Sequence, residues 1–285
     1  MVKLSVVIPT YERPDDLERC LESLYSANQT IEEDFEILVS DDSISADSKR
    51  LVRSKFPSVS WGVGKKNGPA GNRNAGVARA KGEWIVFLDD DCFATPQYLE
   101  AYSNAISKYP ETEVFEGRIF PDRPRFTWAE GCPSNEKGGM LWTSNLCIRK
   151  SLFTEMNGLD ERFRVAFEDV DLAYRLKQKG MDSRFITEAS VCHPWRTLRK
   201  SRKNWKQKGY EWESLMLFLQ KHPDAEEEYG NPRTYLRHAF RMVTKDLFTC
   251  LFFLKGRGID VLADQFLCTS ITTVRICLGS WKKCR

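Results

Sequence analysis

The first third of the chain alternates short apolar runs with amphipathic stretches. Between the first two runs, apolar residues recur at helical spacing from Leu17 to Leu24, behind Pro14, which is typical of a helix with one buried face. The runs themselves have the length and composition of strands: Leu4–Ile8, Phe35–Val39, Val59–Val63 and Trp84–Leu88. This alternation predicts an α/β fold, with βαβ units on a mostly parallel sheet flanked by helices.

The apolar run Trp84–Leu88 ends in three consecutive carboxylates, Asp89–Asp91. Adjacent charges at the mouth of a buried strand repel each other and lose hydration, which is costly without a counter-charge. Carboxylate oxygens suit Mg²⁺ or Mn²⁺, so the stretch predicts a divalent-cation site, with a solvated acidic loop as the alternative. Thr10, Asp41 and Asp42 follow two other expected strands, and parallel sheets bind ligands at that edge.

Beyond these units the pattern becomes less regular. Val114–Phe120 predicts a strand, and the apolar residues of Met140–Trp142 and Asn145–Ile148 predict another. The segment between them, Pro121–Gly139, is a long loop with several prolines and charges. A loop of this length is usually functional, so we expect a mobile lid or a segment that faces an acceptor.

The segment Phe167–Gly180 predicts a helix whose acidic first turn and basic last turn match the helix dipole. Its early acids could all serve as caps. We expect this of Asp171, which is placed to pair with Arg175 one turn later. Asp169, at the helix start, could equally be aimed into a cleft.

His193 is one of three histidines in the chain and follows a short predicted strand, Phe185–Ile186. A lone histidine is more often a hydrogen-bonded structural residue than a metal ligand.

Composition excludes several classes of protein. The 285 residues carry 43 basic and 40 acidic side chains. The resulting net charge of +3 does not produce the overall positive potential that attracts nucleic acid. Nine scattered cysteines without a CxxC pair predict reduced thiols in a cytosolic protein, and neither a signal peptide nor a membrane span is expected. The turn Pro9–Pro14 is not GxGxxG, and Gly62–Lys66 lacks P-loop spacing, which argues against nicotinamide dehydrogenases and P-loop enzymes.

The last third of the chain is basic at its start and apolar later. Residues 195–210 hold seven basic and no acidic residues, interleaved with aromatic ones. We prefer a strip that faces anionic lipid headgroups or a lipid-diphosphate acceptor to a nucleic-acid patch, with a solvated helix face as the alternative. Glu211–Gln220 predicts a helix and Asp224–Gly230 an acidic loop.

Two further helices are expected, one that includes Leu247–Leu254 and one over Ile259–Leu278. Packing on the α/β domain is the default for such helices. A homodimer interface and a peripheral position in the membrane interface, on the inner face of the cell membrane, are the alternatives.

Short motifs in a fixed order carry a further signal. They are, in chain order, Val6–Tyr11, Ile37–Ser43, Gly71–Gly76, Phe87–Asp91, Gly158–Phe163, Glu168–Leu172 and His193–Trp195. With these motifs, roughly residues 3–196 resemble the nucleotide-sugar-dependent glycosyltransferases of family 2, which have the GT-A fold. One departure is the Ser40–Ile44 loop, where many relatives have Gly before the Ser; this affects the loop shape, not the Asp.

The resemblance implies a role for each matching residue. Six would bind the donor: Thr10, Tyr11, Asp41, Arg73, Asp89 and Asp90. The first two would line the base pocket, the third would bond the pyrimidine edge, the arginine would contact base or diphosphate, and the last two would bind the ribose or help hold the metal. Asp91 and His193 would ligate a Mn²⁺ or Mg²⁺ ion that bridges the donor diphosphate, and Asp169 would be the catalytic base.

The resemblance also implies an inverting transfer of a sugar from a UDP-sugar, or from dTDP-rhamnose, to a hydroxyl of a glycan or lipid-linked acceptor in cell-surface polysaccharide synthesis. The catalytic domain would cover residues 1–196, with nucleotide binding up to about residue 110 and the acceptor part over 111–196, followed by a helical region, 197–285. A non-catalytic nucleotide- or sugar-binding protein is one alternative. A nucleotidyltransferase is another, but it would need a Gly-rich basic loop in place of Pro9–Pro14.

Overall fold

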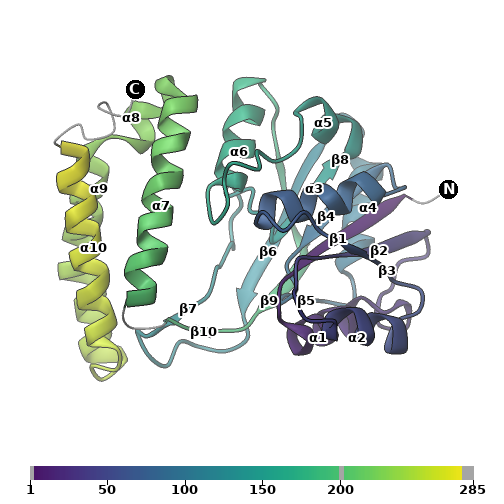
Figure 1. The fold of residues 1–285 in the computed structure, drawn as a ribbon, viewed down its shortest axis with the longest axis horizontal. Helices are drawn as coiled ribbons and strands as arrows, with labels where there is room; N and C mark the ends of the chain where they lie inside the picture. The colour runs from purple at the N-terminus through teal and green to yellow at the C-terminus, as the bar shows by residue number, and fades with distance from the viewer. Residues whose placement is uncertain (1–2, 199–201, 278–285) are drawn as a thin grey trace. The chain divides into compact units, whose positions relative to one another are not determined.

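The computed structural model describes residues 3–198 and 202–277, and the chain divides into two compact units (Figure 1). One unit contains the chain up to Asp122, together with Pro133–Arg164 and Glu168–Pro194. The other contains Arg123–Cys132, Val165–Phe167 and the chain from Trp195 onward. Each unit is therefore assembled from segments that are distant in sequence.

Within the described residues, the first unit is built on a mixed sheet of eight strands in the order β3-β2-β1-β4-β8-β6-β9-β5. The strands are β1 (Leu4–Thr10), β2 (Phe35–Asp41), β3 (Ser60–Val63), β4 (Trp84–Leu88), β5 (Phe93–Ala94), β6 (Val114–Pro121), β8 (Asn145–Arg149) and β9 (Arg184–His193). Strands β3, β2, β1 and β4 are parallel, whereas β8 and β5 run antiparallel to their neighbours. The predicted mostly parallel sheet is confirmed.

Strand β1 continues through Pro9 to Thr10, beyond the apolar run that predicted it. The carbonyl of Thr10 accepts from Asp42 N, next to β2, so Pro9 faces the other neighbour, β4. Pairing between β1 and β4 ends at Val7. Pro9 therefore sits where no ladder donor is needed, which is where a strand tolerates proline.

The side chains of successive β1 residues point to opposite faces of the sheet. Val6 and Ile8 belong to one apolar core and Val7 to the other, as the period of two along a strand requires. The first core is covered by α1 (Pro14–Leu24), α2 (Asp47–Lys55) and α4 (Tyr98–Lys108), and the second by α3 (Pro69–Arg79), α5 (Lys150–Glu155) and α6 (Glu168–Gln178). The strand ends that carry the acids lie between these two helical layers.

The prediction that Met140–Trp142 forms a strand is wrong. These residues have no regular structure, because the backbone donors of Met140 and Leu141 bind a carboxylate instead of a neighbouring strand. Buried Glu116, on β6, accepts from the backbone N of Gly139 at 2.5 Å, Met140 at 3.1 Å and Leu141 at 3.2 Å. A fourth bond comes from Asn135 Nδ2 at 3.1 Å, so one side chain anchors the end of the long loop.

The second unit consists of helices and one small antiparallel pair, β7 (Glu130–Gly131) with β10 (Arg196–Thr197). Its helices are α7 (Arg202–Lys221), α8 (Glu226–Tyr229), α9 (Pro232–Arg241) and α10 (Ile259–Cys277). Helix α9 continues through two π-helical turns, Met242–Asp246 and Thr249–Phe253, and packs beside α10 (Figure 1). A core of five buried residues joins them: Trp128, Met242, Cys250, Leu254 and Leu262.

One prediction for this unit is wrong, and another falls largely outside the described residues. Asp224–Gly230 is not a loop but a 3₁₀ turn followed by α8, because Pro223 fixes a helical start and the acids of the first turn suit the helix dipole. Of the basic strip, Arg199 and Lys200 lie outside the described residues, and the side chains of residues 202–208 are likewise not described. In the described part of the chain, no helix combines the length and the apolar content that a bilayer span requires.

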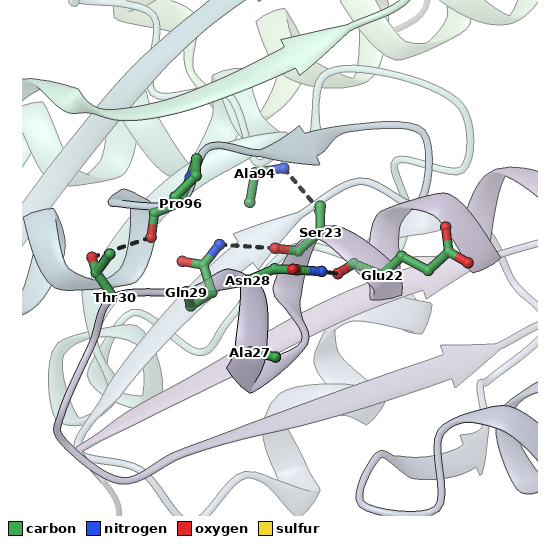
Figure 2. A pocket seen from close by; sticks show the side chains of 8 residues that line it. All are labelled: Glu22, Ser23, Ala27, Asn28, Gln29, Thr30, Ala94 and Pro96. Atoms are coloured by element: carbon green, nitrogen blue, oxygen red, sulfur yellow. Dashed lines mark hydrogen bonds between the residues drawn. The ribbon is translucent and has the colours of Figure 1, made fainter.

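A hollow of about 440 Å³ lies between the end of α1 and β5 (Figure 2). Its polar groups join neighbouring segments of the chain. The Gln29 amide donates to the carbonyl of Ser23, in α1, at 2.8 Å and to that of Thr95, just after β5, at 2.9 Å. Among its lining residues, only Glu22 is titratable. This hollow anchors the loop after α1 and does not hold the predicted site residues.

We expect the Glu116 anchor to contribute strongly to stability. The Glu116→Ala variant should lose about 2–4 kcal/mol of unfolding free energy in urea, because it leaves the buried Asn135 amide and three partly buried backbone N–H groups without their acceptor. Glu83, which is mostly exposed and pairs with Arg149, provides the control. Glu83→Ala should change the unfolding free energy by less than about 1 kcal/mol, and equal losses in the two variants would contradict the anchoring role.

Candidate functional site

Asp91 and His193 lie together although they are far apart in the sequence. Strand β5 follows the acids of β4 and pairs with the end of β9, with Phe93 opposite Cys192. This pairing brings Asp91 Oδ1 to 3.4 Å from His193 Nε2, and both side chains are buried. His193 Nδ1 lies 2.8 Å from the carbonyl of Pro194, which can only accept, so Nδ1 carries a proton and Nε2 faces the carboxylate.

This pair fits a divalent cation. Ligands of Mg²⁺ lie about 2.0–2.1 Å from the ion, so adjacent ligand atoms are about 3 Å apart, close to the spacing of Asp91 and His193. A neutral imidazole lone pair and a carboxylate oxygen repel each other unless a proton or a cation lies between them. Cys92 Sγ is also near, but burial raises the pKa of this thiol well above its usual range, which leaves a protonated and poor ligand for a hard cation.

The structure adds Arg13, which the sequence pattern did not single out. Its Nη1 lies 2.7 Å from Asp91 Oδ2 and its Nη2 lies 2.6 Å from Asp90 Oδ1, the latter without hydrogen-bond alignment. Burial lowers the pKa of Arg13, but the neighbouring aspartates outweigh that effect and raise it. The signal was present in the sequence, as a basic residue in the turn after β1, at the sheet edge that the acids share.

Asp89 and Asp90 have different surroundings. Asp90 is fully buried and accepts from Thr10 Oγ1 at 2.7 Å, and burial raises its pKa to about 7 against the opposing effects of Arg13 and Thr10. The Asp89 side chain is 28% exposed. The donor contacts predicted for these acids and for Thr10 stay predictions, and Asp89 is the acid of the two that reaches solvent.

Arg73, on α3, joins the end of β4 to the start of α6. Its Nη2 lies 2.6 Å from Asp89 Oδ1 and its Nη1 lies 3.1 Å from Glu168 Oε1, with the guanidinium almost fully buried. Its Nε has no hydrogen-bond partner among the described residues. The donor contact predicted for Arg73 stays a prediction, and the structure shows the arginine as an ionic bridge between two elements of the site.

Asp169 is the next residue after Glu168, which forms one end of this ionic bridge. Its Oδ1 accepts from the N–H of Val170 at 2.8 Å, and its side chain is half-buried. Burial raises the pKa of Asp169, with the Val170 N–H and Arg73 opposing it, and burial raises the pKa of Glu168 to about 7. Glu168 is thus held by Arg73, while Asp169 is the more accessible carboxylate.

The expected pair of Asp171 and Arg175 is confirmed. Arg175 Nε lies 2.8 Å from Asp171 Oδ2, and the same guanidinium donates to the carbonyl of Gly158 at 2.8 Å. Asp171 is fully buried. The aspartate therefore fixes the turn before α6 and has a structural role.

Tyr11 follows β1 and Asp41 is the last residue of the neighbouring β2, at the same sheet edge. Asp41 is buried and accepts from Trp61 Nε1 at 3.0 Å and from Ser43 N at 2.8 Å. Tyr11 is 56% exposed, and the next residue, Glu12, has a positive φ of 53° that turns the chain toward the Ser43 loop. The base-pocket roles of Tyr11 and Asp41 stay predictions.

Comparison with known proteins gives related sequences. The sequence model of Glycosyl transferase family 2 matches residues 5–146, and that of Glycosyl transferase family group 2 matches residues 84–254. An uncharacterized glycosyltransferase of Haemophilus influenzae is 28% identical over 193 residues, which is 62% of each chain. The N-acetylglucosaminyl-diphospho-decaprenol L-rhamnosyltransferase of Mycobacterium tuberculosis is 26% identical over 234 residues, 67% of this chain and 75% of that one. This chain thus spans less than two thirds of the Haemophilus relative.

Solved structures share the fold. S. aureus TarS, residues 1–349, aligns with a TM-score of 0.59 and 18% identity, over 76% of this chain and 64% of that one. At this identity the likeness shows the GT-A architecture and no more. Since the model of Glycosyl transferase family group 2 covers more than half of the sequence and that of Glycosyl transferase family 2 about half, the chain belongs to the family 2 group of glycosyl transferases.

Proposed function

We propose that this protein is an inverting, metal-dependent glycosyltransferase that moves a sugar from a nucleoside-diphosphate sugar to a hydroxyl of a glycan or lipid-linked acceptor. The observation that carries the proposal is the meeting of Asp91 with His193 at the sheet edge where Arg73 links the acids of β4 to the start of α6. Structures of TarS in complex with UDP and UDP-GlcNAc support a UDP-sugar donor. The name of the Mycobacterium relative keeps a rhamnosyl donor and a lipid-diphosphate acceptor open.

In this proposal Asp91 and His193 hold a Mn²⁺ or Mg²⁺ ion. The bound cation offsets the negative charge that develops on the departing diphosphate. A neutral imidazole is a more usual ligand for transition metals than for Mg²⁺, so the donor set favours Mn²⁺. His193 keeps its orientation through the Nδ1 bond to the Pro194 carbonyl.

Asp169 is the proposed base. It accepts the proton of the acceptor hydroxyl as that oxygen attacks the anomeric carbon, a contribution of typically ~10²–10⁴ in rate. Its raised pKa makes it a stronger base than an exposed aspartate. Its neighbour Glu168 is buried and engaged by Arg73, so it is not offered as a nucleophile beside Asp169, which fits one displacement with inversion.

Arg13 is the proposed counter-ion of the acids before the cation and donor bind. Its guanidinium contacts Asp90 and Asp91, and 44% of its side chain is exposed. An arginine with this freedom can release Asp91 to a cation and turn to the donor diphosphate, for which its fork of N–H donors is suited. The cation and Arg13 therefore compete for the same carboxylate.

The first prediction concerns Asp169. Asp169→Asn should keep the fold and donor binding but lower the transfer rate by ~10²-fold or more, because the amide cannot accept the proton. Asp171→Asn, two residues away, is the matched control, since it should lower the melting temperature while the folded fraction retains transfer. Transfer is followed by nucleoside-diphosphate release, and near-normal transfer by Asp169→Asn would remove the residue from the mechanism. Donor binding by the wild type without any nucleoside-diphosphate release would favour the binding-protein alternative.

The second prediction concerns pH. Because burial raises the pKa of Asp169 above the ordinary aspartate value of 3.8, the base becomes protonated at a higher pH than an exposed aspartate. The transfer rate should therefore fall as the pH is lowered, with an apparent pKa in kcat above 3.8. Circular dichroism at each pH separates loss of the base from unfolding. A rate that stays constant down to pH values at which the protein unfolds would exclude Asp169 as the titrating group.

The third prediction concerns Arg13. Calorimetric titration with Mn²⁺ alone should show about tenfold tighter binding to Arg13→Gln than to the wild type, because a competing charge is removed from Asp91. Arg19→Gln, which removes an exposed arginine paired with Asp16, should leave Mn²⁺ binding unchanged. Asp91→Asn should abolish the binding in either background. Equal or weaker binding by Arg13→Gln would show that Arg13 does not compete with the ion.

A further inference from the structure

More than half of the exposed large apolar side chains in the described residues lie on one hairpin, formed by α9 with its π-helical continuation and α10. They are Leu236, Phe240, Val243, Phe248, Leu251, Phe252, Phe253, Ile259, Phe266, Leu267 and Val274. Single exposed apolar residues need no explanation, but a concentration of this size on one pair of helices marks an interaction surface.

Three phenylalanines near the turn of the hairpin form the centre of this surface. Phe248, Phe252 and Phe253 are 53%, 69% and 74% exposed. The Phe248 ring centroid lies 4.5 Å from that of Phe252 and 6.1 Å from that of Phe253. The rings thus pack on one another while most of their surface faces solvent, and we call them the phenylalanine cluster.

The turn that follows the cluster is fixed to the rest of its unit. Lys255, Gly256 and Gly258 have positive φ values of 51°, 72° and 81°, which close the turn tightly. Trp128 N donates to the carbonyl of Arg257 at 2.8 Å, and a Cβ at Gly258 would lie 2.3 Å from Ala129 N. The cluster is therefore presented on a supported turn, next to the buried Cys250 and Leu254.

Basic side chains outnumber acidic ones along the hairpin. Between Pro232 and Cys277 the chain carries seven Lys and Arg residues, all exposed, and three acidic residues. The basic residues are Arg233, Arg237, Arg241, Lys245, Lys255, Arg257 and Arg275, and the acids are Asp246, Asp260 and Asp264. Of these acids, Asp246 lies 3.6 Å from Arg241. A second copy of this chain would bring like charges together, whereas an anionic bilayer would complement them.

We propose that this hairpin docks on the surface of an anionic lipid bilayer, with the phenylalanine cluster among the headgroups and the basic residues against lipid phosphates. Phenylalanine is typical of the apolar face of helices that lie in the membrane interface, and apolar burial combined with basic residues gives reversible binding in the interface plane. The proposal concerns the helical unit alone and does not depend on the proposed transfer reaction. It adds a reason why a lipid-linked acceptor would be reached at the membrane surface.

Co-sedimentation with vesicles tests the proposal without donor or acceptor. The wild type should bind vesicles that contain anionic phosphatidylglycerol and should bind pure phosphatidylcholine at least tenfold more weakly, with binding reduced several-fold when salt is raised from 0.1 to 0.5 M. Phe252→Ser combined with Phe253→Ser should weaken binding about tenfold or more, since two interfacial rings are lost. Lys255→Gln combined with Arg257→Gln should weaken it about tenfold, at ~1 kcal/mol per charge.

Val63→Ser is the matched control, because it removes an exposed apolar side chain from β3 in the other unit and should leave vesicle binding unchanged. All four altered hairpin positions are exposed, and an unchanged melting temperature confirms the fold. Nucleoside-diphosphate release with a soluble acceptor should also be unchanged, so a failed transfer assay and a failed vesicle assay are separate results. No wild-type binding, equal binding by the serine variant, or a dimer in light scattering that the serine variant dissociates would overturn the proposal.

Discussion

The site depends on how the negative charge of four neighbouring acids is balanced. Asp89, Asp90, Asp91 and Glu168 gather at one edge of the sheet, and two arginines divide them. Arg13 forms ion pairs with Asp90 and Asp91, and Arg73 forms ion pairs with Asp89 and Glu168. Because an unpaired buried carboxylate costs several kcal/mol, these two guanidinium groups allow the acids to converge before any ligand is present.

The two arginines differ in what they can do next. Arg73 is almost fully buried and joins two elements, so its loss would separate the start of α6 from the end of β4. Arg13 is partly exposed and lies in the turn before α1. A buried counter-charge thus holds the proposed base in place, while the partly exposed one is the counter-charge that the proposed cation and donor would replace.

Much of the fold could be predicted because local patterns determine it. The period of two in β1 and the helical spacing in α1 each describe one buried face, and both elements form where they are expected. The failure at Met140–Trp142 has a non-local cause, since a carboxylate on β6 removes the backbone donors from pairing. No propensity of the residues themselves contains that information.

In the candidate site, too, local motifs could be recognised in the sequence, whereas contacts between distant residues could not. The motifs pointed to Asp91 and His193, and the pairing of β5 with β9 brings them together. Arg13 was missed because a lone basic residue in a turn has no periodicity and gains meaning only beside the acids of another strand. The donor roles of Thr10, Tyr11 and Asp41 came from the resemblance and remain predictions.

Pro9 has a consequence that reaches beyond its own strand. Strand β1 lies between β2 and β4, with the later strands added on opposite sides, and such a switch point leaves a crevice where neighbouring strands part. A residue with an N–H at position 9 could donate a further backbone hydrogen bond to β4, and the pairing of the two strands could then extend toward the acids. Proline has no N–H and cannot form that hydrogen bond. A chemically inert side chain therefore keeps the ends of the two strands unpaired at the entrance to the site.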